Sequence, residues 1–294
     1  MSVSEEIGFV PVHWLVTNEE YHGDLECDSN STLKLFLENR RKYYRKRILR
    51  EQIEEKYSLG MNLGSALHIR LMPAYADEYQ DRVEVVSSGE KSGAFAEAVR
   101  CNEGKIILPA SECYRVDAME ASVRRNPYAM QLIESVSSSE HAVRFLDAAT
   151  KRPLKVMFDI LTAANRIVDI KTTKETDDEG ISRALFELGY YRQSALYCTA
   201  RDLYRPFLGD DVPGQFAENG FTYIFVSNNG DFDCRVRHID TASLNLGASH
   251  NAQILQSLAD CRDFWMGGEW QNHGVDEVRH VGVPPWSFNK ELNL

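Results

Sequence analysis

Two aspartates and one lysine interrupt the strand-like runs of the stretch FDILTAANRIVDIKTT, which covers residues 158–173. They are Asp159, Asp169 and Lys171. Charged side chains are costly to bury unless they are paired or bind a metal ion. Two close carboxylates repel each other unless one takes up a proton, and a divalent cation such as Mg²⁺ or Mn²⁺ relieves that repulsion. A lysine beside such an ion can orient or activate water, or stabilise developing negative charge.

A β-hairpin would bring these residues together. The stretch contains two strand-like runs joined by a short turn, which we place at Ala164–Asn165. In this register Asp159 lies opposite Ile170 and beside Asp169. Side chains alternate between the two faces of a strand, so Asp169 shares a face with Lys171. The other face collects four apolar side chains: Phe158, Ile160, Val168 and Ile170.

The same spacing also fits an ion pair between Lys171 and one aspartate on an exposed sheet face. Short motifs alone do not separate this structural interpretation from a metal site. Both interpretations stand at this point, and other features of the chain must decide between them.

The charge of the chain is uneven. Its 294 residues carry a formal net charge of −11, which opposes non-specific nucleic-acid binding by the surface as a whole. Yet the run RRKYYRKRILR, from Arg40 to Arg50, holds seven basic residues and no acid. Such a run is either a solvated helix face or a patch that contacts phosphates. Its candidate DNA contacts are Arg40, Arg41, Arg45 and Arg47.

The composition is that of a globular protein without a membrane anchor. The N-terminus has no basic region followed by a long apolar run, so we expect no secretory signal. No apolar run approaches the roughly 20 residues that span a bilayer. The six cysteines form no CxxC pair, which argues against a zinc ribbon and against a disulfide framework. We therefore expect a cytoplasmic protein with no membrane partner.

The pattern of apolar residues predicts helices in the first part of the chain. A helix should begin near Asn30 or Ser31, after cap-type residues. A second helix should carry Leu63, Leu67 and Leu71 on one face. Beyond it, residues 84 to 135 suggest short helices around one short strand, Lys105–Leu108.

The second part of the chain is richer in predicted strands. We expect three strands between residues 141 and 173, one helix over 181–204, a hairpin over 221–239 with a turn at Asn229-Gly230, and a terminal helix over 251–268. This order of elements favours a single α/β domain with a mixed sheet.

The charged hairpin resembles the motif of the PD-(D/E)xK nuclease superfamily, which has an acid on one strand and Asp-x-Lys on the next. Here Asp-x-Lys is residues 169–171, followed by two threonines as in the RecB-like and RecE-like branches. The segment NLGSALHIRLMP resembles a helix of RecE-type phage exonucleases and places that family's histidine at His68. The segment NSTLKLF resembles the family's opening helix.

Further matches extend the resemblance along the chain. SSSEHAVRFLDAATKRPLKVMFDIL resembles the family's Glu-led first strand, with Glu140 at the acid position. GYYRQSALY resembles its Tyr/Gln helix and gives Tyr190 and Gln193, and the tail from FWMGG to PPW resembles its C-terminus. The matches together cover most of residues 28 to 288. The chain departs from the family at Met157-Phe158, where a basic or polar pair is usual, and it lacks the proline expected soon after the opening helix.

The resemblance implies a fold and a domain organisation. The fold is a central mixed β-sheet flanked by helices, the restriction-endonuclease-like PD-(D/E)xK core. Residues 1–294 would form one nuclease domain, with a mainly helical part over about 28–135 and the catalytic core over about 136–288.

The resemblance also implies roles for single residues. Asp159 and Asp169 would bind the metal with the Ile170 carbonyl and His68, and Lys171 would be the catalytic lysine. The resemblance gives three further positions near the metal. Glu140 would hold a second metal or orient a water, and Tyr190 and Gln193 would touch the scissile phosphate or a base. Ordinary packing or ion pairing is the structural alternative for His68, Glu140, Tyr190 and Gln193.

The function implied is a Mg²⁺- or Mn²⁺-dependent hydrolase that degrades double-stranded DNA ends in the 5′ to 3′ direction during phage-type recombination. The family works with a single-strand annealing protein and forms a ring around DNA. One alternative is a RecB-like repair or CRISPR-adaptation nuclease with an iron–sulfur cluster, but Cys198, Cys234 and Cys261 are too far apart for the cluster's motif. A second is a non-catalytic DNA-binding protein on the same fold, against which the intact Asp159 and Lys171 argue.

Overall fold

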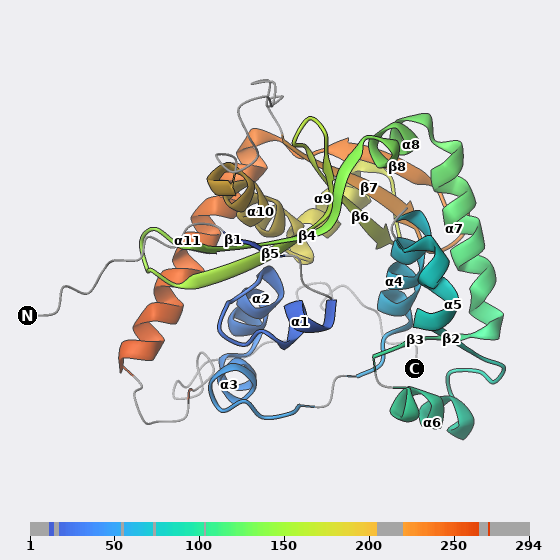
Figure 1. The fold of residues 1–294 in the computed structure, drawn as a ribbon, viewed down its shortest axis with the longest axis horizontal. Helices are drawn as coiled ribbons and strands as arrows, with labels where there is room; N and C mark the ends of the chain where they lie inside the picture. Colours follow the sequence, from blue (N-terminus) through green and yellow to red (C-terminus); the bar gives the residue numbers. More distant parts are fainter. Residues whose placement is uncertain are drawn as a thin grey trace, which may run out of the picture.

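A six-stranded mixed sheet forms the centre of the computed structural model, which describes residues 12–14, 18–53, 56–72, 75–102, 104–204, 220–264 and 270. Neighbouring strands follow the order β1 (Val12–Trp14), β4 (Val136–Leu146), β5 (Pro153–Thr162), β6 (Ile167–Thr173), β7 (Phe221–Ser227) and β8 (Cys234–His238). Only β6 and β7 are parallel, because the chain crosses over between them through two helices (Figure 1).

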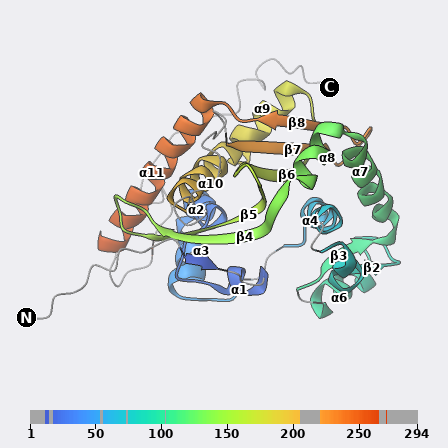
Figure 2. The ribbon, with the colours of Figure 1, turned by 45° about the horizontal axis from the view of Figure 1, so that its top comes forward.

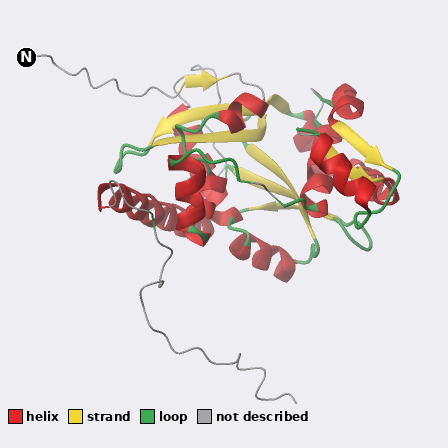
Figure 3. Ribbon diagram, turned by 90° about the horizontal axis from the view of Figure 1, so that it is seen from below, coloured by secondary structure: helices red, strands yellow, loops and turns green. Residues whose placement is uncertain are grey.

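Helices cover both faces of this sheet. One face buries a cluster with α2 (Asn30–Glu38), α10 (Tyr190–Tyr204) and α11 (Thr241–Phe264). The opposite face buries a second cluster with α4 (Leu59–Leu71), α7 (Cys113–Arg125) and α8 (Pro127–Glu134). Figure 3 shows the strands running between the two sets of helices.

A small parallel sheet lies beside α4, at the end of the molecule away from α11 (Figure 2). It consists of β2 (Val83–Val86) and β3 (Ile106–Pro109). The remaining helices are α1 (Asn18–Gly23), α3 (Arg40–Tyr43) with a π-helical turn over Tyr44–Ile48, α5 (Tyr79–Arg82), α6 (Gly93–Cys101) and α9 (Asp178–Glu187), with 3₁₀ turns at Ala76–Glu78 and Ala110–Glu112.

The mixed α/β fold predicted from the sequence is confirmed. α2 begins at Asn30, because the Ser29 side chain caps it by accepting from the Thr32 N–H. Leu63, Leu67 and Leu71 are all buried on one face of α4. The β7–β8 hairpin is antiparallel, as its alternation and its Asn-Gly turn signal predicted.

The structure differs from the prediction in one helix that is split, one helix boundary and one strand that was missed. The single helix over 181–204 is two helices, because the chain breaks at Gly189, whose φ of +74° only glycine adopts easily. The last helix begins at Thr241, ten residues earlier than predicted. β2 was not predicted at all, since four residues show too little alternation to stand out. The tail matched beyond α11 lies, apart from Trp270, outside the described residues.

The described residues contain neither a membrane-spanning helix nor a disulfide bond. Across the described helices, none combines the length and the apolar character needed to cross a bilayer. All six cysteines are free thiols, so none of them cross-links the fold through a disulfide bond.

Candidate active site

The β5–β6 hairpin differs by one residue from its predicted register. Ile160 pairs with Val168 and Leu161 with Ile167, so Asp159 is brought across from Asp169 rather than from Ile170. The reason is the turn, in which Asn165 adopts a left-handed φ of +55°. Three residues therefore form the loop, a common hairpin type, where a two-residue turn was assumed.

Asp169 is fully buried and is held from two sides. Its Oδ2 atom lies 2.7 Å from Lys171 Nζ, and its Oδ1 atom accepts a hydrogen bond of 2.8 Å from Gln193 Nε2 on α10. Lys171 Nζ also lies 5.2 Å from the centre of the Tyr190 ring. The strand thus supplies the acid and the lysine, and α10 fixes both.

Asp159 is held from the opposite side, by α4. Its Oδ2 atom accepts from the Ile170 N–H at 3.2 Å and lies 3.2 Å from His68 Nε2. Glu140 Oε1 lies 3.9 Å from the other ring nitrogen of His68. Two helices from opposite faces of the sheet therefore converge where β5 and β6 part.

A glycine allows α4 to approach the sheet so closely. A Cβ atom at Gly64 would lie 3.0 Å from the Thr172 side-chain oxygen on β6. Such a contact is tighter than ordinary van der Waals packing, so a side chain at this position would push the helix outward. His68 lies one turn further along α4, and its distance from Asp159 depends on this contact.

One acid of the site interrupts a regular strand. Glu140 has a left-handed φ of +46°, and β4 pairs with β5 on both sides of it, through Ser139 and His141. On β5, Phe158 packs in the cluster with α10, where its ring centre lies 5.7 Å from that of Tyr197, whereas Ile160 packs in the opposite cluster. The prediction that Phe158 shares a face with Ile160, Val168 and Ile170 is therefore wrong, although the other three do pack together.

Burial and mutual repulsion set the charges of the two aspartates. Burial, together with the charge of Asp159, raises the pKa of Asp169 to about 7. Burial also acts on Asp159, but the imidazole of His68 and the ammonium of Lys171 outweigh it and lower the pKa of that carboxyl. The two carboxylates therefore repel each other, and a bound cation would remove this repulsion.

Lys171 stays protonated in this setting. Burial alone would lower its pKa, but the carboxylates of Asp169 and Asp159 outweigh burial and raise it. The same balance holds at His68. Burial would lower the pKa of its imidazole, but the carboxylate of Asp159 outweighs burial and raises that pKa. The ion pair considered from the sequence does exist, but it lies under two helices and not on an exposed sheet face.

The residues fit a divalent metal ion in their donor atoms. As they stand, no three His, Cys, Asp or Glu side chains within the described ranges are arranged as a ready metal site. However, His68 Nε2 is buried without a hydrogen-bond partner in these ranges, and it lies 3.2 Å from Asp159 Oδ2. An octahedral ion with bonds of about 2.1 Å holds adjacent ligands about 3 Å apart, so the two atoms are spaced as ligands of one ion.

Two residues of the site had not been predicted. Burial, followed by the charge of Glu140, raises the pKa of Tyr75, and burial, with smaller contributions from the charges of Asp169 and Asp159, raises the pKa of Tyr197, so both rings lie near the carboxylates of the site. Tyr197 follows Gln193 by four residues on the same helix, a spacing that could have identified it. Tyr75 lies beyond the end of α4, and no sequence signal connects it with Glu140.

The basic run is not a uniform solvated face. Arg47 is buried, donates to the Cys27 carbonyl at 2.5 Å and pairs with Asp28, so its prediction as a DNA contact is wrong. Arg40 donates to Ser257 on α11 at 2.7 Å, which ties the run to the core. Arg41 is exposed, and Arg45 is half exposed and pairs with Glu51, so these two stay candidates.

Sheet, helices and acidic hairpin together define a class, the PD-(D/E)xK nuclease superfamily. Within it, the chain belongs to the family described as "PDDEXK-like domain of unknown function (DUF3799)", whose model matches residues 29–263. The fold is similar to the crystal structure of a "Putative exonuclease" from Eubacterium rectale, with 16% identity and a TM-score of 0.59 over 95% of this chain and 100% of that chain. No curated protein matches the sequence.

Proposed function

We propose that this protein is a metal-dependent deoxyribonuclease, and in particular an exonuclease that shortens double-stranded DNA from its 5′ ends. The observation that carries the proposal is the convergence of Asp159, Asp169 and Lys171 at one buried point, fixed by His68 and Gln193 from two helices. The PDDEXK-like family match and the exonuclease description of the similar structure support the nuclease part of this proposal.

Asp159, Asp169 and His68 would hold a Mg²⁺ or Mn²⁺ ion, with the Ile170 carbonyl as a further ligand. When bound, such an ion lowers the pKa of water and stabilises charge on a phosphate. Gln193 keeps the Asp169 carboxylate in one orientation through Oδ1. Glu140 lies beside the far nitrogen of His68 and favours the proton there, which leaves Nε2 as the ligand atom.

Lys171 acts in this scheme as a protonated donor. Its ammonium, which the two aspartates keep charged, orients the attacking water and stabilises the negative charge that develops on the phosphate. Water adds to phosphorus, the bond to the 3′ oxygen breaks, and the products carry a 5′-phosphate and a 3′-hydroxyl. Tyr190 lies over Lys171 and is placed to contact the phosphate or a base.

The proposed partners follow from the resemblance to RecE-like exonucleases. We propose that the substrate is a double-stranded DNA end, that the enzyme acts in recombination beside a single-strand annealing protein, and that it forms a ring around DNA. Light scattering of the purified protein, with and without a blunt duplex, tests the ring: a mass of one chain in both conditions would contradict it.

Cleavage of labelled DNA tests the activity. Linear duplex labelled at the 5′ or the 3′ end is incubated with MgCl₂ or with EDTA, beside a closed circular duplex. We expect early release of the 5′ label as a mononucleotide, no reaction in EDTA and an intact circle. Asp169→Asn should be inactive, whereas Asp233→Asn, an exposed aspartate paired with Arg235, should match the wild type. Full activity in EDTA or in Asp169→Asn would overturn the proposal.

A further inference from the structure

A pocket of about 360 Å³ lies on the side of α10 that faces away from the candidate active site. On α10, Tyr190 and Gln193 point to Lys171 and Asp169, whereas the two residues between them point the other way. Helices α2, α3, α10 and α11 supply its lining residues, which are Phe36, Leu37, Arg40, Tyr191, Arg192, His250, Gln253, Ile254 and Ser257.

The pocket contains a buried guanidinium without an anion. Arg192 is only 7% exposed, and no carboxylate of the described residues lies within ion-pair distance of it. Its Nε atom is buried and has no hydrogen-bond partner among them, and the guanidinium lies against Gly189. Since an unpaired buried charge is costly, this arrangement favours binding of an anion.

The other polar groups of the pocket are also cationic or neutral. Arg40 donates to the Ser257 hydroxyl at 2.7 Å and lies over the Phe36 ring. His250 is hydrogen-bonded to the Tyr191 hydroxyl at 2.7 Å. None of the nine lining residues is an acid, although the whole chain carries a net charge of −11. The pocket is thus a local positive site on an acidic protein.

Exposed apolar side chains surround this positive site. Leu37 lines the pocket and is 50% exposed, and Phe186, stacked on Tyr191, is 63% exposed. Leu246 is 44% exposed and lies one turn before His250 on α11. An apolar rim around a cationic centre is the pattern of a protein-binding surface with a charged anchor.

We propose that this pocket binds an acidic, apolar peptide segment of a partner protein. A carboxylate of the peptide would pair with Arg192 and Arg40, and a neighbouring aliphatic side chain would pack on Leu37. A nucleotide fits less well, because a base needs a free aromatic face inside the pocket. Of the lining rings, Phe36 is 1% exposed beneath Arg40, and Tyr191 is 7% exposed with Phe186 stacked on it. This proposal does not depend on the nuclease activity.

Fluorescence anisotropy with defined peptides tests the proposal. The probe is a fluorescein-labelled octapeptide of alternating aspartate and leucine, compared with its lysine–leucine counterpart and with unlabelled dAMP as competitor. We expect saturable binding of the acidic peptide with a Kd of roughly 100 μM or tighter, no binding of the basic peptide and no competition by dAMP. Arg192→Met should weaken binding by about tenfold or more.

Two further variants keep the test decisive. Leu37→Asp changes an exposed residue, so it should fold, and its charge should repel the acidic peptide and weaken binding about tenfold. Arg183→Gln removes an arginine of α9 that does not line the pocket and is already paired with Glu175 and Glu179, and it should bind as the wild type does. Binding that is absent, unchanged in Leu37→Asp or displaced by dAMP would overturn the proposal.

Discussion

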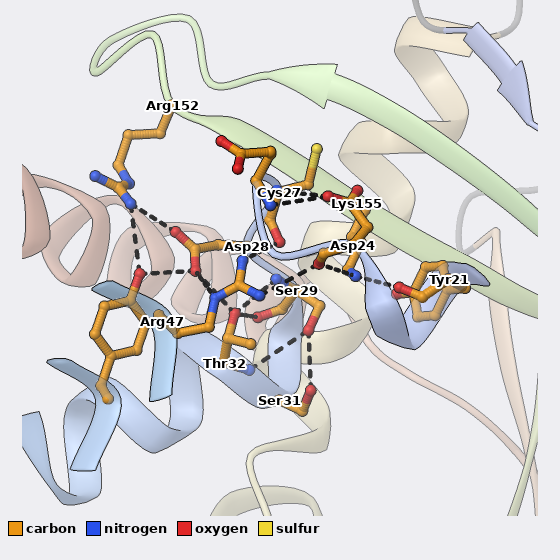
Figure 4. Close-up of polar contacts among 12 residues, drawn as sticks. Tyr21, Asp24, Cys27, Asp28, Ser29, Ser31, Thr32, Arg47, Arg152 and Lys155 are labelled. Atoms are coloured by element: carbon orange, nitrogen blue, oxygen red, sulfur yellow. Dashed lines mark hydrogen bonds and ion pairs between the residues drawn. The ribbon is translucent and has the colours of Figure 1, made fainter. Parts of the chain in front are cut away.

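Two clusters of buried charge stabilise different parts of this molecule, and they are built differently. The first centres on Asp28, which is 1% exposed (Figure 4). Its Oδ1 accepts from the Tyr43 hydroxyl at 2.8 Å and from Thr32 at 3.1 Å, and its Oδ2 accepts from Arg152 at 2.7 Å. Arg47 adds a second cation to the same carboxylate.

The Asp28 cluster continues to a neighbouring buried lysine. Lys155 donates to the carbonyl of Asp24 at 2.8 Å and to that of Tyr21, as Figure 4 shows. Burial lowers the pKa of Lys155 to about 8. These contacts join the chain around α1 and the start of α2 to the beginning of β5, so the cluster anchors the N-terminal part to the sheet.

The active-site cluster has the opposite balance of charge. Three carboxylates, those of Asp159, Asp169 and Glu140, gather around Lys171 and His68. Burial, together with the charge of Asp159, raises the pKa of Asp169 to about 7, since two cations are shared among three carboxylates. In the anchoring cluster the buried acid is paired with cations, whereas in a site that can bind a cation the carboxylates outnumber the cationic side chains.

Removing the acid of each cluster should separate the two roles, with the largest effect on stability at Asp28. Asp28→Ala leaves Arg47 and Arg152 without their acid in a buried site, so the free energy of unfolding should fall by about 3–5 kcal/mol. Asp169→Asn keeps the shape of a side chain whose charge is disfavoured, and it should stay within about 1 kcal/mol of the wild type. Urea unfolding of both variants measures the difference, and equal losses would show that the clusters do not differ.

Replacing the lysine of the active site should affect chemistry more than binding. Lys171→Met should lower turnover by at least about a hundredfold, because it removes the charged donor nearest the proposed phosphate position, while duplex affinity changes little. Lys105→Met is the matched control, since Lys105 pairs with Glu84 in the small sheet. Single-turnover cleavage measures both, and near-normal turnover in Lys171→Met would reduce this lysine to an ion-pair partner.

Forcing α4 away from the sheet should have an intermediate effect. Gly64→Val places carbon atoms against Thr172, and we expect a loss of about 1–3 kcal/mol in stability. We also expect weaker Mn²⁺ binding, because His68 moves with the helix. Gly60→Ala on the same helix meets no atom within 4 Å and should be neutral or slightly stabilising. Unchanged Mn²⁺ affinity in Gly64→Val would show that His68 is not a ligand.

The smallest effect should come from the exposed arginines of the basic run. If Arg41 and Arg45 contact phosphates, changing both to Gln should lower the slope of log affinity against log salt by about 0.9 for each. Turnover at saturating DNA should stay constant, because they lie outside the site. Filter binding over a range of salt concentrations measures the slope, and an unchanged slope would make the run purely structural.

The sequence predicts those parts of the site that follow from strand alternation and from short motifs. Alternation places Asp169 and Lys171 on one face, and helical spacing places Tyr190 with Gln193. It does not predict features set by single backbone conformations, such as the left-handed Asn165 in the turn of the shifted hairpin and the left-handed Glu140, which lies across from the point where Phe158 and Ile160 take opposite faces.

Long-range pairing is the second kind of feature that the sequence hides. Arg47 looks like part of a surface patch because its neighbours are basic, yet Asp28, nineteen positions earlier, buries it. Arg192 shows the converse, since nothing in GYYRQSALY distinguishes it from the arginines that pair with a carboxylate, and no acid of the described residues pairs with it. Such contacts depend on how elements distant in sequence pack together, which local patterns do not encode.

The proposed function depends above all on Asp159 and Asp169 together binding a divalent cation. Titration calorimetry with Mn²⁺ on the wild type, Asp159→Asn, Asp169→Asn and Asp233→Asn tests this binding most directly. We expect saturable binding in the wild type and in Asp233→Asn, and none in the two site variants. Equal Mn²⁺ binding in all four proteins, or none in the wild type, would contradict it.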